Sequence, residues 1–75
     1  MYEQVEVLLA DVLQIPVASI TDDLAMNDTD PWDSLRHMEL VVSLEQAYGL
    51  EFSFDDIVAM RTVGDIKRVL RERGV

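Results

Sequence analysis

One serine in this chain stands where a covalent group could be attached and held. Ser34 lies in the run Pro31-Trp32-Asp33-Ser34-Leu35, directly before an apolar-periodic stretch that extends to Tyr48. Asp and Ser begin helices because their side chains accept hydrogen bonds from the free N–H groups of the first turn. A hydroxyl at this point is exposed at the positive end of the helix dipole, where an attached phosphate would be stabilised.

Two other groups of chemistry-bearing residues favour no function of their own. Asp33, Ser34 and His37 are the residue types of a hydrolytic triad, but the histidine lies on the same helix and so short a chain cannot enclose a substrate. The run Asp28-x-Asp30 followed by Glu39 is spaced like a Ca²⁺ loop, but Asp33 stands where that loop requires glycine. We therefore expect no catalytic residue, no metal site and an acidic loop exposed to water. Weak binding of a divalent ion is the alternative for its aspartates, Asp22, Asp23, Asp28 and Asp30.

Composition narrows the function further. The 75 residues are 49% hydrophobic, which predicts a compact core and one domain over residues 1–75. The absence of cysteine fits a reducing, cytoplasmic compartment. A formal charge of −9 opposes binding to nucleic acid and favours partners with basic surfaces. The first residues do not resemble a signal peptide and no apolar run is long enough to cross a membrane, so we expect a cytoplasmic monomer without membrane insertion.

The elements that must position Ser34 are predicted to be helices. The first ends before Pro16, because proline disfavours helix in the residue that precedes it. Its apolar face, at helical spacing, consists of Val5, Leu8, Leu9, Val12 and Leu13. A long connection follows from about residue 15 to 32, and its length indicates a functional loop or a hidden helical turn. Its apolar anchors to the core are expected to be Ile20, Leu24 and Met26.

The second predicted helix runs from Ser34 to about Tyr48. A short third helix over about 54–60 follows its cap Ser53, and the last helix follows its cap Thr62. The fold class is therefore predicted to be all-α, a four-helix bundle with a long first loop and a short third helix. The last helix would bury Val63, Ile66, Val69 and Leu70.

The second helix carries two apolar stripes. The broader one is predicted to face the core. A helix with one core face does not need the second stripe, which consists of Leu35, Met38 and Val42. This stripe either packs under the long loop or the third helix, or forms a docking surface beside the serine. The predicted core residues are Leu40, Val41, Leu44, Ala47 and Tyr48.

These residues resemble the acyl carrier protein family. The D-S-L that opens the family's second helix corresponds to Asp33-Ser34-Leu35. Its continuation as E-L-V and L-E corresponds to Glu39-Leu40-Val41 and Leu44-Glu45. The T-V-G-D that begins the family's last helix corresponds to Thr62-Val63-Gly64-Asp65. The resemblance covers nearly the whole chain and implies the four-helix carrier fold.

The resemblance implies a carrier and not an enzyme. Ser34, beside its helix cap Asp33, would receive 4′-phosphopantetheine from coenzyme A through a separate Mg²⁺-dependent phosphopantetheinyl transferase. The arm would supply the thiol that this chain lacks and hold acyl intermediates as thioesters. A loading enzyme and downstream synthases or transferases would then use the cargo. The surface that contacts these partners would comprise Leu35, Arg36, Met38, Glu39, Val42 and Glu45.

Three residues near the serine depart from the family's pattern. Arg36 stands where fatty-acid carriers place an acid, so its partners are expected to present an acidic or neutral spot. Trp32 is expected to anchor the loop to the core, and His37 to pack at the boundary with the loop. The run 31–38 is similar to stand-alone carriers of specialised pathways such as polyketide biosynthesis. An aminoacyl or peptidyl carrier, and a small acidic helical adaptor that binds a partner non-covalently, are the alternatives.

Overall fold

The computed structural model describes residues 3–26 and 32–74, which form four α-helices and one short 3₁₀ helix. Within these residues there is no β-strand, only an isolated bridge between Ala25 and Thr62. The predicted all-α fold with a short third helix is confirmed, and the long first loop contains a helical turn. In chain order the elements are α1 (Gln4–Leu13), η1 (Val17–Ser19), α2 (Ser34–Tyr48), α3 (Phe54–Ala59) and α4 (Val63–Glu72).

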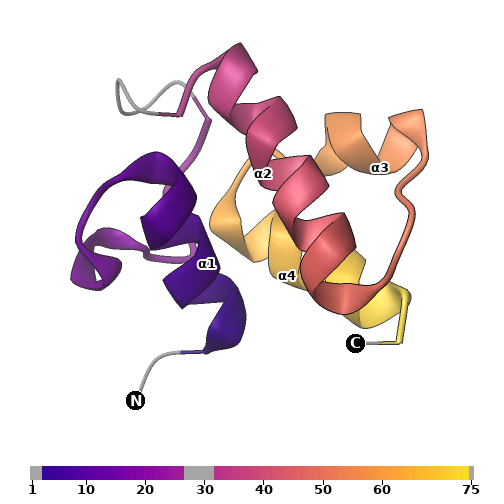
Figure 1. Ribbon diagram of the computed structural model, residues 1–75, viewed down its shortest axis with the longest axis horizontal. Coiled ribbons are helices and arrows are strands. Elements are labelled where there is room, and N and C mark those ends of the chain that lie inside the picture. The colour runs from indigo at the N-terminus through magenta and orange to yellow at the C-terminus, as the bar shows by residue number, and fades with distance from the viewer. Residues whose placement is uncertain (1–2, 27–31, 75) are drawn as a thin grey trace.

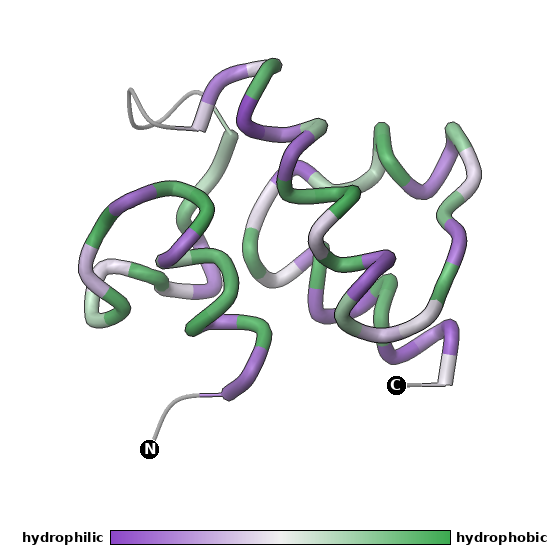
Figure 2. The backbone as a smooth tube through the Cα atoms, viewed as in Figure 1, coloured by the Kyte–Doolittle hydropathy of each residue, from purple (hydrophilic) through white to green (hydrophobic). Residues whose placement is uncertain are grey.

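The helices are arranged around α2. In Figure 1, α1 and the first loop lie on one side of α2, α3 lies on the other, and α4 runs behind α2. Figure 2 shows apolar positions, in green, interspersed with polar positions, in purple, along these helices. This pattern is typical of helices that bury one face and leave the other in water.

The acidic residues Asp28 and Asp30 of the possible Ca²⁺ loop lie outside the described part of the chain. Among the described residues, no group of three or more His, Asp or Glu side chains is placed to hold a metal ion. None of the helices in residues 3–26 and 32–74 combines the length and the apolar character that crossing a membrane requires.

The core is formed by one face of each of the three longer helices, closed by residues from the connections. The predicted inward faces of α1 and α4 are confirmed, although Leu8 and Val12 pack at the edge of the core rather than inside it. Of the expected anchors of the first loop, Ile20 lies in the core, and Leu24 and Met26 pack against it. The buried apolar residues are Val5, Leu9, Leu13, Ile20, Trp32, Leu40, Val41, Leu44, Phe52, Met60, Val63, Ile66, Val69 and Leu70.

The buried face of α2 differs from the predicted one at both ends. Ala47, predicted to be core, is exposed, and Tyr48 is only half-buried. At the other end, His37 is buried and extends the stripe by one turn toward the start of the helix. At roughly 100° per residue, His37 and Leu44 lie on one line down the helix, and Ala47 falls at the edge of the stripe. The buried stripe is therefore narrower and begins closer to Ser34 than predicted.

Side chains cap α3 and α4 where predicted. The hydroxyl of Ser53 accepts a hydrogen bond from Asp56 N, and the Asp56 carboxylate accepts one from Ser53 N, each at 3.1 Å. The hydroxyl of Thr62 accepts from Asp65 N at 3.0 Å. These bonds satisfy N–H groups that a helix start leaves free. α3 ends at Ala59, one residue before the predicted boundary.

Backbone hydrogen bonds hold the first loop against the start of α4. Val63 N donates to the carbonyl of Leu24 at 3.0 Å, and Gly64 N donates to the carbonyl of Asp22 at 2.9 Å. A Cβ at Gly64 would lie 3.2 Å from the same carbonyl oxygen, so this close approach favours glycine. The described part of the first loop is therefore held by its backbone as well as by its apolar side chains.

Lys67 fastens α4 to α1 and to the first loop. Its Nζ lies 2.6 Å from a carboxylate oxygen of Asp22, 3.0 Å from Glu6 and 3.8 Å from Glu3. The hydrogen bond with Asp22 raises the pKa of Lys67 above its ordinary value. The pKa of Glu6 is lowered, first by the hydrogen bond from the backbone N–H of Glu3 and then by Lys67. On the far side of the bundle, Arg73 pairs with Asp56 and ties α4 to α3.

The lowered pKa of Glu6 makes one part of the stability depend on pH. Its carboxylate stabilises the fold above the ordinary value of 4.5, and this contribution is lost as the pH falls through the lowered pKa of the folded state. We expect Glu6→Gln to lower the melting temperature at neutral pH and to match the parent in acid. Thermal unfolding followed by circular dichroism from about pH 7 to about pH 3 measures this difference.

The matched control for Glu6→Gln is Glu72→Gln, which removes the same charge from an exposed position on α4. Any effect of net charge alone therefore appears in both variants. A difference between Glu6→Gln and the parent that stays constant with pH would show that Glu6 acts through packing and not through its charge.

The buried face of α2 is tested by shortening Leu44, which is completely inaccessible to solvent. Leu44→Ala is expected to lower the free energy of unfolding by about 2–5 kcal/mol, because it removes buried methyl groups and leaves a cavity. Val58→Ala on the exposed side of α3 is the control, and its effect is expected to stay within about 0.5 kcal/mol. Denaturant unfolding measures both, and equal effects would show that this face of α2 is not the core.

Candidate functional site

Ser34 is the first residue of α2, as predicted, and its side chain is exposed. Asp33 caps the helix with an extended backbone, and its Oδ1 accepts a hydrogen bond from Arg36 N at 2.9 Å. The carbonyl of Asp33 accepts the first bond of the helix, from His37 N, at 2.9 Å. This geometry presents a hydroxyl to solvent at the positive end of a helix of 15 residues, which favours a negatively charged substituent.

Behind Ser34, a hydrogen bond joins two buried aromatic side chains. Trp32 is completely buried, which confirms its expected place as the anchor between the loop and the core. Its indole Nε1–H donates to Nδ1 of His37 at 3.1 Å, and the two rings stack with centroids 6.2 Å apart. Only 6% of His37 is exposed, so this residue lies deeper than the boundary position predicted for it. The reason is that the first turn of α2 already packs against the core, where the buried ring of Trp32 covers the imidazole.

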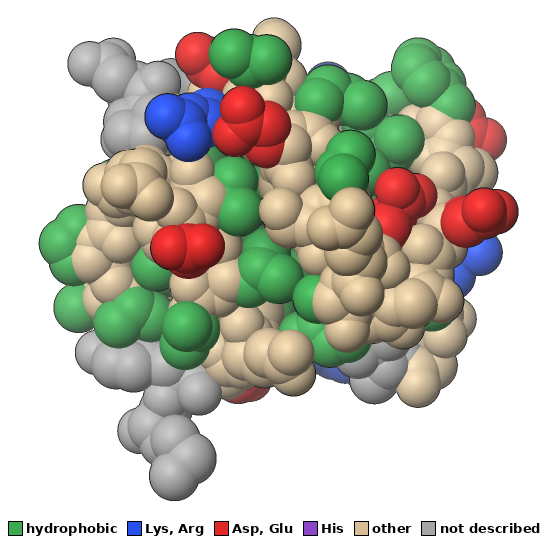
Figure 3. All heavy atoms as spheres, viewed as in Figure 1, with side chains coloured by type: hydrophobic (Ala, Val, Ile, Leu, Met, Phe, Trp, Pro, Cys, Tyr) green, Lys and Arg blue, Asp and Glu red, His purple; other side chains and the backbone are tan. Residues whose placement is uncertain are grey.

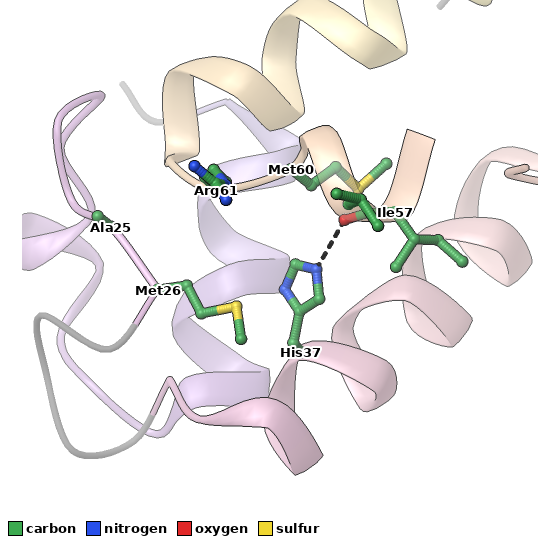
Figure 4. Close-up of a pocket in the computed structure, with 7 residues that line it drawn as sticks. Ala25, Met26, His37, Ile57, Met60 and Arg61 are labelled. Atoms are coloured by element: carbon green, nitrogen blue, oxygen red, sulfur yellow. Dashed lines mark hydrogen bonds between the residues drawn. The ribbon is translucent and has the colours of Figure 1, made fainter. Parts of the chain in front are cut away.

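The second ring nitrogen of His37 reaches α3. Nε2 lies 3.1 Å from the carbonyl oxygen of Ile57 (Figure 4). An indole N–H can only donate and a carbonyl can only accept, so these partners assign the proton to Nε2 and the lone pair to Nδ1. Both nitrogens of His37 are thus engaged inside the protein. Neither is available as a base for Ser34, which argues against a hydrolytic triad.

Arg36 is turned toward α1. Its Nη1 donates to the carbonyl of Val12 at 2.9 Å and lies 3.5 Å from a carboxylate oxygen of Glu39. The last carbonyls of a helix lack partners within the helix and attract cations, and α1 has no basic residue in its own last turn. The missing cation signals only that the end of α1 can accept a cation from elsewhere, and it does not point to Arg36. Arg36 therefore links the start of α2 to the end of α1.

The second apolar stripe of α2 is open to solvent. The exposed fractions of Leu35, Met38 and Val42 are 68%, 50% and 47%. With Glu39 and Ser43 they line a shallow depression of about 480 Å³. Neither α3 nor the described part of the first loop covers this stripe, so the alternative in which the stripe packs under them is wrong. Figure 3 shows hydrophobic side chains gathered at the surface over α2 and α3, with acidic side chains among them.

The other acidic residue assigned to this surface has a structural partner. The carboxylate of Glu45 accepts a hydrogen bond from Phe52 N at 2.9 Å and so fixes the connection between α2 and α3. α3 adds two further exposed apolar residues to the surface, Phe54 and Val58, which the sequence pattern did not indicate. A helix as short as α3 has too few positions for its pattern to show which face is buried.

A cavity of about 510 Å³ lies beside His37. Figure 4 shows Met26 from the first loop and Ile57 and Met60 from the α3 region around the imidazole. The segments that form the cavity are far apart in the chain, so no local pattern in the sequence indicated it. Its lining comprises Ala25, Met26, His37, Ile57, Val58, Met60 and Arg61.

Comparison with known proteins agrees with this geometry. The family described as "Phosphopantetheine attachment site" matches residues 3–70. An "Acyl carrier protein" of Chlamydia trachomatis serovar D is 31% identical over 71 residues, which cover 95% of this chain and 92% of that protein. "Polyketide-8 synthase acyl carrier protein 2" of Streptomyces avermitilis is 34% identical over 61 residues, which cover 81% of this chain and 70% of that protein.

The chain therefore belongs to the acyl carrier protein family. Its members are carrier proteins rather than enzymes, and membership implies a covalently attached 4′-phosphopantetheine. The residues at the start of α2 fit that group. The serine hydroxyl faces solvent, its neighbour Asp33 is occupied in capping the helix, and the helix dipole favours a phosphodiester at this position.

Proposed function

We propose that Ser34 carries the 4′-phosphopantetheine arm and that the protein presents acyl intermediates to biosynthetic enzymes. The observation that carries this proposal is the exposed hydroxyl at the first position of α2, held by the Asp33 cap. The arm supplies the thiol on which the cargo is held, which a chain without cysteine cannot provide. The protein itself contributes a rigid helix start and a negatively charged surface that directs the encounter with its partners.

The cargo that we propose is a polyketide or another acyl intermediate of specialised biosynthesis. The name of the relative from Streptomyces avermitilis supports a polyketide, as do the departures at Trp32, Arg36 and His37 from the pattern of fatty-acid carriers. An aminoacyl or peptidyl cargo on the same arm is the second candidate. The proposed partners are a phosphopantetheinyl transferase, a loading enzyme and downstream synthases or transferases. The lack of cysteine supports a reducing, cytoplasmic setting.

We further propose that these partners dock on the second apolar stripe of α2. Leu35, Met38 and Val42 lie next to Ser34 along the helix, and Glu39, half-exposed, stands among them. An apolar patch with acidic neighbours fits a small, transient interface with a basic rim. Arg36 keeps 41% of its side chain exposed and remains a proposed contact, although its bond to Val12 makes it an internal link as well. Glu45 also remains a proposed partner contact, although its carboxylate already accepts a hydrogen bond from Phe52 N.

Modification of Ser34 is tested with coenzyme A, Mg²⁺ and a phosphopantetheinyl transferase of broad specificity. We expect the intact mass of the parent to rise by one prosthetic group and that of Ser34→Ala to stay unchanged. Ser19→Ala, at an exposed serine of η1 outside the proposed docking surface, is the control and should accept the group like the parent. Because Asp33 still caps the helix, Ser34→Ala is expected to change stability by at most about 1 kcal/mol. If the folded parent gains no mass from a transferase proven active on another carrier, the non-covalent adaptor becomes the better explanation.

The docking surface is tested with Met38→Ala and Val42→Asp. Both side chains are exposed, so we expect the variants to keep the parent's circular dichroism while the rates of arm attachment and cargo loading fall. Val7→Asp places the same change at an exposed apolar position on α1 and should leave both rates unchanged. Unfolding of Val42→Asp would mean that the stripe is part of the core. Parent-like rates in both α2 variants would move the docking surface elsewhere.

A further inference from the structure

Hydrogen bonds close residues 32–37 into a compact unit around Ser34, which we call the clasp. The Asp33 side chain binds Arg36 N, and the Asp33 carbonyl binds His37 N, each at 2.9 Å. These two bonds are made by the helix start itself. The third hydrogen bond joins two side chains, from the indole N–H of Trp32 to Nδ1 of His37 at 3.1 Å. It connects the residue before the cap Asp33 to the residue one helical turn after that cap.

The same imidazole connects the clasp to α3. Its Nε2 lies 3.1 Å from the Ile57 carbonyl, and among the described residues this is the one side-chain hydrogen bond between α2 and α3. Both side chains of the bond between Trp32 and His37 are shielded from water, because Trp32 is completely buried and His37 nearly so. A buried indole N–H that loses its acceptor cannot turn to solvent, so the whole segment would have to move. The clasp therefore depends on where the imidazole of His37 lies. The bond to Ile57 of α3 helps to hold the imidazole there.

We infer that His37 is a positioning residue for arm attachment. It does not contact the reacting atoms. Through Trp32 it holds the chain that enters α2, and thus the Ser34 hydroxyl, in one place, and through Ile57 it couples that place to the position of α3. This inference rests on the proposed attachment at Ser34. It separates presentation of the hydroxyl, which the clasp provides, from recognition by partners, which the exposed stripe of α2 provides.

Two amide substitutions separate the two bonds of His37. In His37→Asn the amide oxygen can take the position of Nδ1 and accept from Trp32, but the side chain is too short to reach Ile57. In His37→Gln the amide nitrogen can take the position of Nε2 and donate to Ile57, and the acceptor for Trp32 is lost. Trp32→Phe removes the indole donor together with part of the ring system and keeps a buried aromatic ring. Val69→Ala, a buried truncation in α4 away from the clasp, is the control for lost stability.

The first measurement is the steady-state kinetics of the transferase with each variant as substrate, at a temperature where all are folded. We expect Trp32→Phe and His37→Gln to lower kcat about tenfold and to leave KM within about twofold, because a displaced hydroxyl costs rate while the docking stripe is unchanged. His37→Asn should restore most of the parent's kcat. Val69→Ala should match the parent, since its loss of stability does not reach the clasp.

The second measurement follows the coupling without the transferase. Hydrogen exchange of the α3 amides should become faster in His37→Asn, which loses the bond to Ile57, and stay near the parent in Trp32→Phe. Trp32 is the single tryptophan of the chain, so its fluorescence should change in His37→Gln and less in His37→Asn. These two measurements follow the hydrogen bonds of Trp32 and His37 in the folded chain, without any partner enzyme.

The outcomes distinguish this inference from the proposed function. If the parent accepts no arm at all, attachment at Ser34 fails, and the exchange and fluorescence measurements still decide whether the coupling exists. If the parent is modified and Trp32→Phe and His37→Gln keep its kcat, the positioning role is overturned. It is overturned as well if Val69→Ala loses as much kcat as they do, because His37 would then act only through stability.

Discussion

The burial of Trp32 requires an acceptor for its indole N–H, and the start of α2 is built around that requirement. A completely buried indole cannot turn its N–H to water, so an acceptor must stand within the core. His37 provides it, which leaves its other nitrogen to donate to the carbonyl of Ile57. One aromatic pair therefore joins the residue before the helix cap to the first turn of α2, and joins that turn to α3.

The two faces of α2 divide the work of the molecule. The inward face, from His37 to Leu44, joins the core and makes the helix rigid. The outward face places Leu35, Met38 and Val42 in water, on the helix that begins with the exposed Ser34. A domain this small buries a limited share of its surface, and much of α2 stays available for contacts with other proteins. Membership of the acyl carrier protein family agrees with that arrangement, because a carrier delivers its cargo to the active sites of other proteins.

Local patterns predicted the elements of this fold well. Helical spacing located the helices, and the caps Asp33, Ser53 and Thr62 fixed where three of them begin. These features depend on residues three or four apart, whose contacts are set by helix geometry alone. Predictions failed where the environment of a side chain depends on distant elements. Ala47 proved exposed because only the packing of the other helices decides how wide the buried stripe of α2 is.

The sequence by itself determined the all-α class, the order of the helices and the place of Ser34 at the start of one of them, because these follow from periodicity and capping within short segments. The tertiary structure alone decided that Arg36 binds the end of α1 and that Glu45 binds the backbone at Phe52. It also decided that His37 links Trp32 to α3. Charged and polar side chains find such partners only when separate segments of the chain are packed together. Hydrogen bonds act over about 3 Å, and helical periodicity does not encode that proximity.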